Sequence, residues 1–196
     1  MSGGATERPA TLDHLRSRKK PLTQSVTIVL DSEVAEQWDE ANDALNNARN
    51  AIAVAERERA PRPRLAQLES DAADAEAKVE ELRPIVREHS QDFRFRSIGR
   101  RAFEELIGQH PATAAQKAKA LADNDPEPAW NGETFAPALV AASMIEPPAT
   151  EAEVIDLWND AAWSGPELLT LWAAALNVNN TRRVADLGNA SGTTSN

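Results

Sequence analysis

The fold is decided by residues 34–82, which read VAEQWDEANDALNNARNAIAVAERERAPRPRLAQLESDAADAEAKVEEL. Apolar residues recur there at alternating spacings of four and three, as Val34, Trp38, Ala41, Leu45, Ala48, Ile52 and Ala55, and again as Leu65, Leu68, Ala72, Ala75, Val79 and Leu82. This is the heptad spacing of helices that pack side by side. The prolines of RAPRP, residues 59–63, interrupt it, because proline lacks an amide donor and clashes with the preceding turn. The stretch therefore predicts two long helices joined by a short loop, an antiparallel helical hairpin.

Two segments with alternating apolar residues flank the hairpin, near positions 25–30 and 92–96. The alternating residues are Val26, Ile28 and Leu30 in the first segment and Phe93 and Phe95 in the second. Such alternation is typical of β-strands that are buried on one face. Because an antiparallel hairpin returns the chain to its starting point, we expect the two strands to pair antiparallel at its base, with their apolar faces turned to a common core. Two strands alone are marginally stable, so that face requires a helix against it.

Shorter helices are predicted for most of the remaining chain. The segment FAPALVAASMIE, residues 135–146, is apolar nearly all round and should be buried. The segments that begin at Thr150 and Ser164 each place a glutamate three residues later, which is the spacing of a helix capping box. Four of the five tryptophans lie within residues 130–172. We interpret them as core residues rather than as a ligand platform and expect the compact core there.

These patterns predict a mainly α protein: a long antiparallel helical hairpin on a small two-stranded antiparallel β element, plus a compact C-terminal helical bundle. Charge and breaker residues divide the chain into four parts. Residues 1–20 are predicted to be a flexible basic arm, and residues 21–110 to hold a strand, the hairpin, a second strand and a helix. Residues 111–180 should form the compact C-terminal helical region, and residues 181–196 a flexible tail.

The composition narrows the classes of function. The 196 residues include 31 acidic and 21 basic side chains, and the net charge of -10 disfavours a nucleic-acid binder. Cysteine is absent, which fits a reducing compartment. No apolar run has the length needed to cross a bilayer, and the first twenty residues lack the apolar segment of a secretory signal.

The sequence shows no catalytic or metal-binding motif. Its three histidines stand apart from any marked nucleophile or acid, and phosphate-binding glycine motifs are absent. Residues 123–134 begin like a calcium loop, but Pro128 and Thr134 occupy the positions that require glycine and a bidentate glutamate. We therefore expect a protein that is not an enzyme and that has no catalytic residues, no cofactor and no metal.

Contact with a partner is the activity that the sequence favours. The hairpin seam is rich in alanine, so it either packs on itself or recruits a partner helix, and both readings stay open. The arginines of FRFRSIGRR, residues 93–101, could contact an acidic or phosphate-bearing partner, with Arg100 and Arg101 near a helix start. The favoured reading is that Arg94 and Arg96 form the solvent face of a strand and pair with acidic residues of the hairpin. The candidate partner-binding residues are Trp38, Leu45, Ile52, Leu68, Val79, Arg94, Arg96, Arg100, Arg101, Phe135 and Leu139.

The order of the segments resembles a known family. A basic arm ending KKP precedes the strand TIVLD and the charged, alanine-rich hairpin. The segments FRFRSIGRRAFEELIGQHP and FAPALVAASMIEP follow, and the last helix ends WAAALNVN. This order resembles the tail assembly chaperones of long-tailed (siphovirus-type) phages that infect actinobacteria, over roughly residues 11–180. The most specific stretches are Phe93–Pro111 and Phe135–Pro147, with Trp172–Asn177 in support.

The resemblance implies a non-catalytic helper of virion assembly. Proteins of this family bind the tape measure protein, which is long, helical and prone to aggregate, and keep it soluble while the tail tube polymerises. The implied partners are the phage tape measure protein, the major tail protein and a longer product of the same chain made by programmed frameshift. Self-association is left open, and no membrane is implied. The implied location is the host cytoplasm, with the chain absent from the mature virion.

Two other classes of function stay open. A structural minor tail or connector protein would share this composition but would remain in purified virions. A regulatory nucleic-acid-binding protein would use the basic arm and the arginine cluster, and its DNA binding would fall steeply with salt. The total charge argues against this second alternative, and an enzyme ranks last.

Overall fold

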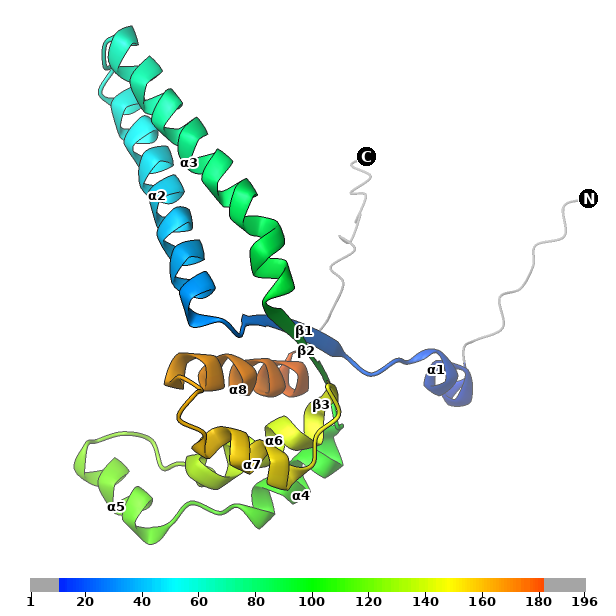
Figure 1. The fold of residues 1–196 in the computed structure, drawn as a ribbon. Coiled ribbons are helices and arrows are strands. Elements are labelled where there is room, and N and C mark those ends of the chain that lie inside the picture. The colour runs from blue at the N-terminus through cyan, green and yellow to red at the C-terminus, as the bar shows by residue number, and fades with distance from the viewer. Residues whose placement is uncertain (1–10, 182–196) are drawn as a thin grey trace, which may run out of the picture. The chain divides into compact units, whose positions relative to one another are not determined.

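The computed structural model describes residues 11–181, which are mainly helical, as predicted, with a small antiparallel sheet (Figure 1). Its elements are α1 (Leu12–Arg18), β1 (Thr23–Val29), α2 (Ser32–Arg57), α3 (Arg62–Glu88), β2 (Ser90–Arg96), α4 (Arg100–Gln109), α5 (Ala114–Ala122), α6 (Gly132–Ser143), β3 (Met144–Glu146), α7 (Glu151–Asn159) and α8 (Gly165–Asn180). The described residues divide into two compact units. Residues 25–93 form one unit, and residues 11–24 together with 94–181 form the other.

The predicted helical hairpin is present in the first unit. Helices α2 and α3 lie side by side and are joined by a short loop that ends at Pro61 (Figure 1). Four buried residues form the core between them, namely Ala41, Leu45, Val79 and Leu82, and Trp38 and Ala75 pack against it. All six belong to the predicted heptad seam. Burial of this seam is what holds the two helices together, since long surface helices owe most of their stability to packing of one face.

Local hydrogen bonds determine where α2 begins and where it ends. At its start, Asp31 Oδ1 accepts hydrogen bonds from the backbone N–H groups of Glu33 and Val34, at 3.0 and 3.2 Å. At its end, Arg59 adopts a left-handed conformation with φ of 55°. The N–H of Ala60 then donates to the carbonyl of Ala55, at 2.8 Å, which is the hydrogen bond of a Schellman motif. Helix α2 is thus closed before the prolines are reached.

The sheet has three strands in the order β1-β2-β3, whereas the sequence predicted two. Strand β3 consists of Met144–Glu146, which the sequence assigned to the end of an apolar helix. It pairs antiparallel with β2, and Phe95 lies opposite Met144. The residue before a proline is disfavoured in helical conformation, so Pro147 forces the chain into an extended form here. The prediction of two strands is wrong. The third strand was missed because three residues are too few to show an alternating pattern.

The predicted antiparallel pairing of β1 with β2 is confirmed. The N–H of Leu30 donates to the carbonyl of His89 at 2.8 Å, and the N–H of Ser97 donates to the carbonyl of Leu22 at 2.9 Å. Ile28, Phe93 and Phe95 are buried, as their alternation predicted. Leu30 is exposed, contrary to the prediction, because β1 ends at Val29 and the chain has already turned towards α2.

The C-terminal helices pack around α6, which the sequence predicted to be buried. Helix α6 contacts α4, α7 and α8. Its residues Phe135, Leu139 and Val140 are fully buried. The side chain of Asn179 in α8 ties this unit together: its Oδ1 accepts from the N–H of Ile98 at 3.0 Å, and its Nδ2 donates to Ser143 Oγ at 2.9 Å. These bonds satisfy Ser143, the one buried polar residue among those described.

The N-terminal segment differs in part from the predicted arm. Residues 12–18 form the short helix α1, with Thr11 as its N-cap, where the sequence predicted no regular structure. Its only apolar residues are Leu12 and Leu15, too few to reveal a period in the sequence. Residues 1–10 of the predicted arm and 182–196 of the predicted tail lie outside the described residues.

Candidate functional site

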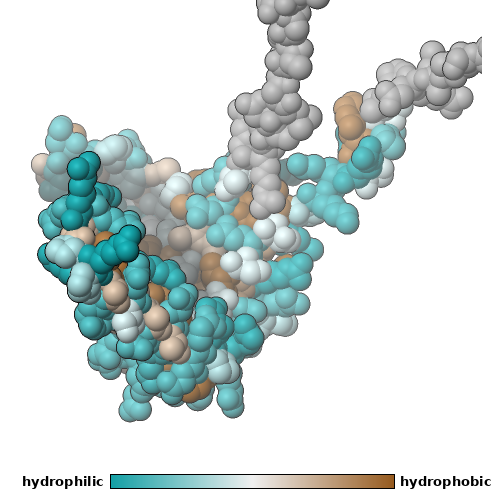
Figure 2. Space-filling model, turned by 90° about the horizontal axis from the view of Figure 1, so that it is seen from above, coloured by the Kyte–Doolittle hydropathy of each residue, from teal (hydrophilic) through white to brown (hydrophobic). Residues whose placement is uncertain are grey.

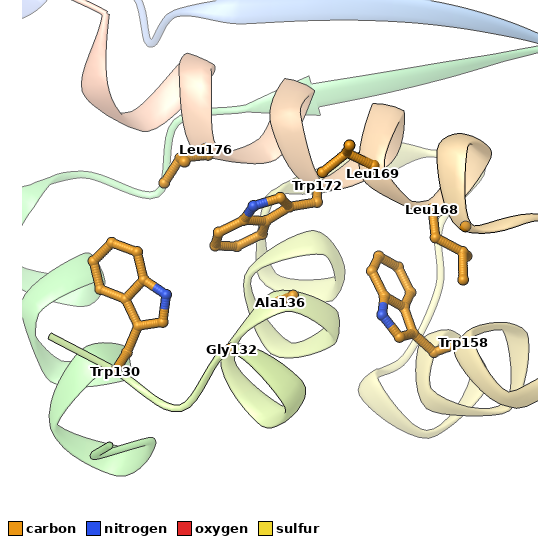
Figure 3. Close-up of a pocket in the computed structure, with 9 residues that line it drawn as sticks. Trp130, Gly132, Ala136, Trp158, Leu168, Leu169, Trp172 and Leu176 are labelled. Atoms are coloured by element: carbon orange, nitrogen blue, oxygen red, sulfur yellow. The ribbon is translucent and has the colours of Figure 1, made fainter. Parts of the chain in front are cut away.

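An apolar cavity of about 500 Å³ opens beside α8 in the C-terminal unit (Figure 3). Three tryptophans come to it from three different parts of the chain: Trp130 before α6, Trp158 in α7 and Trp172 in α8. The remaining lining residues are Gly132, Ala136, Gly165, Leu168, Leu169 and Leu176. All side chains of the lining are apolar or aromatic, so the cavity is built to receive an apolar group.

Helix α8 supplies one wall of this cavity because it carries two apolar faces. Leu168, Trp172 and Leu176 follow one another at intervals of four and therefore share a face, which lines the cavity. The adjoining apolar face, with Leu171 and Val178, is buried in the core. The helix starts with a capping box in which the N–H of Glu167 donates to Ser164 Oγ and the Glu167 carboxylate accepts from the N–H of Ser164. The sequence predicted this box and the one at Thr150, and both are confirmed.

An aromatic cluster fixes two of the three tryptophans. The fully buried ring of Phe135 lies 4.9 Å from Trp130 and 5.7 Å from Trp172, measured between ring centroids. Phe103 of α4 and His110 complete the cluster, at 5.9 and 6.2 Å from Phe135. The contacts of Phe135 with Phe103 and Trp172 are edge to face, an arrangement worth about 1 kcal/mol beyond the buried area. The cavity is therefore largely preformed.

The titratable side chains lie away from the cavity, since none of the described residues that line it is titratable. The pKa shifts among the described residues have local causes elsewhere: the side-chain hydrogen bond from Arg83 lowers the pKa of Glu80, and that from Lys117 lowers the pKa of Glu127. Across residues 11–181, no group of three or more histidine or acidic side chains could hold a metal ion. The arrangement is suited to binding an apolar or aromatic segment of a partner.

The candidate residues of the hairpin fall into two groups. Leu45 and Val79 are buried between α2 and α3, so the seam packs on itself at these positions. Trp38, Ile52 and Leu68 are only partly buried. These three are the seam residues among the candidates that retain apolar surface for a partner.

The arginine cluster is exposed, as predicted for Arg94 and Arg96 on the strand, but the partner of Arg94 differs from the one predicted. Arg94 pairs with Glu146 of β3 at 3.5 Å, not with an acidic residue of the hairpin. Arg100 and Arg101 pair with glutamates one turn later in α4, each at 2.8 Å. Arg96 is exposed on β2. Exposed pairs of this kind contribute at most about 1 kcal/mol each, so the arginines stay available to an acidic partner.

Phe135 and Leu139 cannot serve as partner contacts in this conformation. Both side chains are fully buried in the core of the C-terminal unit. The prediction treated the apolar helix 135–145 as a candidate surface, but its large side chains Phe135, Leu139 and Val140 all point into the core. Of that helix, Ala136 reaches the cavity.

The cavity itself was missed by sequence reasoning, which assigned Trp130, Trp158 and Trp172 to the core. All three are only partly buried. The sequence of α8 could have revealed the cavity. One apolar stripe is enough to pack a helix against a core, and α8 carries additional apolar residues, Leu168 and Leu176, beside that stripe. A helix with two apolar faces either lies inside a core or presents one face to a partner.

Comparison with protein-family models, curated proteins and solved structures found no match to the chain. Among residues 11–181, no helix combines the length and the apolar character that crossing a membrane demands.

Proposed function

We propose that this chain is a non-catalytic tail assembly chaperone of a long-tailed phage of actinobacteria, and that it binds the tape measure protein while the tail tube polymerises. The observation that carries the proposal is that the stretches with the most specific resemblance share one core. Phe103 of 93–111 and Trp172 of 172–177 both contact Phe135 of 135–147, with ring centroids 5.9 and 5.7 Å apart. The three stretches, which are far apart in the chain, thus pack around one aromatic residue.

The surface chemistry supports this role. A chaperone must offer apolar surface to an amphipathic helical partner and must itself remain dispersed. The tryptophan-lined cavity and the partly buried residues of the hairpin seam offer that surface. The net charge of -10 makes copies of the chain repel one another and favours a dispersed state. Binding of the major tail protein and of a frameshifted longer product belongs to the same proposal.

Co-expression tests the proposal. The tape measure protein encoded with the chain is produced with and without it, and its soluble fraction is measured. We expect the chain to raise that fraction several-fold and to be recovered in complex with the tape measure protein. Purified virions, examined by mass spectrometry, should lack the chain.

A strong signal in purified virions, with no effect on the solubility of the tape measure protein, would instead favour the structural alternative, a minor tail or connector protein. Salt-dependent binding of DNA by the purified chain, without capture of the tape measure protein, would favour the regulatory one.

A further inference from the structure

Helix α1 carries apolar surface that nothing in its own short length can bury. Leu12 and Leu15 are 71% and 51% exposed, and their spacing of three places them on one face. Arg16, Arg18 and Lys19 line the same shallow hollow as the two leucines, and Lys20 follows in the sequence. Figure 2 shows this apolar surface next to hydrophilic neighbours. A helix of seven residues is well below the length that is stable alone in water, so α1 needs a surface to rest on.

The tryptophan-lined cavity has the complementary properties. Its lining is apolar, and Leu169 at its edge is 63% exposed. Residues 111–181, the segment that supplies every lining residue, carry ten acidic side chains and only two basic ones, Lys117 and Lys119. An apolar cavity in an acidic segment fits a short apolar helix face bordered by basic residues. Helix α1 has that character.

We propose that α1 of one copy docks into the tryptophan-lined cavity of a second copy, with Leu12 and Leu15 entering the cavity. The connection to β1 favours a second copy over the same chain. Lys19 is extended, with ψ of 118°, and Pro21 confines Lys20 to extended conformations as well. A short, stiff connection of this kind favours exchange of a terminal element between copies.

The contact joins two different surfaces, so it is heterologous. Each copy offers one helix and one cavity, and copies therefore add head to tail until a ring closes or the chain of copies ends. The association is a property of the purified chain and does not depend on the proposed function.

Two full-length variants, each lacking one half of the contact, test this arrangement. Leu12→Ser/Leu15→Ser removes the apolar face of α1 and leaves the cavity intact. Leu169→Lys places a cation at the cavity edge and leaves α1 intact. By sedimentation equilibrium, the wild type should associate and each variant alone should be monomeric. An equimolar mixture of the two should give one-to-one heterodimers, because only one intact contact can form.

The matched control is Leu121→Ser. Leu121 is 83% exposed in α5 and is not part of the cavity lining, so this variant should associate like the wild type. Raising the salt from about 0.05 M to about 0.5 M should weaken the wild-type association several-fold, since screening removes the attraction between the basic helix and the acidic segment. Circular dichroism confirms that each variant is folded.

Four results would overturn the proposal: a wild type that is monomeric at every concentration, variants that associate like the wild type, a mixture that stays monomeric, or loss of association in Leu121→Ser. A monomeric wild type whose tryptophan fluorescence changes with Leu12→Ser/Leu15→Ser would show docking within one copy and would equally exclude the exchange.

Discussion

At the scale of single residues, Arg59 adopts an unfavourable backbone conformation that ends α2 and begins the hairpin loop. Its φ of 55° lies in the left-handed region, which side chains other than glycine enter at a cost. The conformation lets Ala60 donate to the carbonyl of Ala55 and so close α2. The sequence gives no hint of this, because arginine is an ordinary helix former.

Arg59→Gly should therefore stabilise the protein by about 1 kcal/mol, because glycine adopts this conformation without steric cost. The measurement is urea denaturation followed by circular dichroism. The matched control is Ala73→Gly, at an exposed position inside α3, which should destabilise by about 1 kcal/mol. Destabilisation by both changes would contradict the assigned loop conformation.

Asn179 is the residue on which the polar contacts of the C-terminal unit converge. Asn179→Ala should cost about 1–3 kcal/mol, because the N–H of Ile98 and the buried hydroxyl of Ser143 each lose a partner. Thermal unfolding of the variant measures this. Asn177→Ala, two residues earlier on an exposed position of α8, should be close to neutral, and equal effects of the two changes would refute the role given to Asn179.

At the scale of elements, the start of α7 should make the stability depend on pH. The pKa of Glu153 is lowered from 4.5, first by the N–H of Thr150 and then by its hydroxyl. A carboxyl group whose pKa is lower in the folded state stabilises the fold above its unfolded pKa and loses this contribution as the pH falls through the folded pKa. The capping box is thus complete at neutral pH and weakens in acid.

Glu153→Ala should accordingly lower the melting temperature most at neutral pH, and the difference from the wild type should shrink as the pH falls below 4.5. Calorimetry across this range provides the measurement. In a Thr150→Ala background the same change should have a smaller effect, since part of the interaction is already gone. A difference that grows in acid would contradict the assignment.

The hairpin offers an element-scale test of partner binding. Leu68 lies on the seam of α3 and is only partly buried, whereas Ala66 of the same helix is exposed off the seam. Leu68→Ser should reduce the amount of tape measure protein recovered with the chain several-fold, and Ala66→Ser should leave it unchanged. The readout is quantitative pull-down of variants whose helix content equals that of the wild type. Equal recovery with both variants would remove the hairpin seam from the binding surface.

Sequence reasoning succeeded where a periodic pattern extends over many residues. The heptad pattern of the hairpin, which includes Leu45 and Val79, repeats often enough to be recognised. The two helices that pack together are also consecutive in the chain. Strand β3 was missed because it has three residues and its partner Phe95 lies far away in the sequence. The cavity was missed for a related reason: an apolar residue such as Trp172 has the same appearance in a sequence whether it packs in a core or lines an opening.

At the scale of the whole molecule, the chain combines strong negative charge with apolar surface at separate places. The apolar places are the tryptophan-lined cavity, the seam residues that remain partly exposed, and the two leucines of α1. A surface of this kind is suited to helical partners under the proposed function, and the net charge of -10 makes copies of the chain repel one another. Within the part of the chain that the structure describes, the cavity lining holds no titratable side chain.

The most direct test of this account is the soluble fraction of the tape measure protein when it is produced with and without the chain, measured together with the content of purified virions. The account predicts that the chain raises the soluble fraction several-fold, is recovered in complex with the tape measure protein and is absent from virions. A tape measure protein whose solubility is indifferent to the chain, together with the chain present in virions, would contradict it.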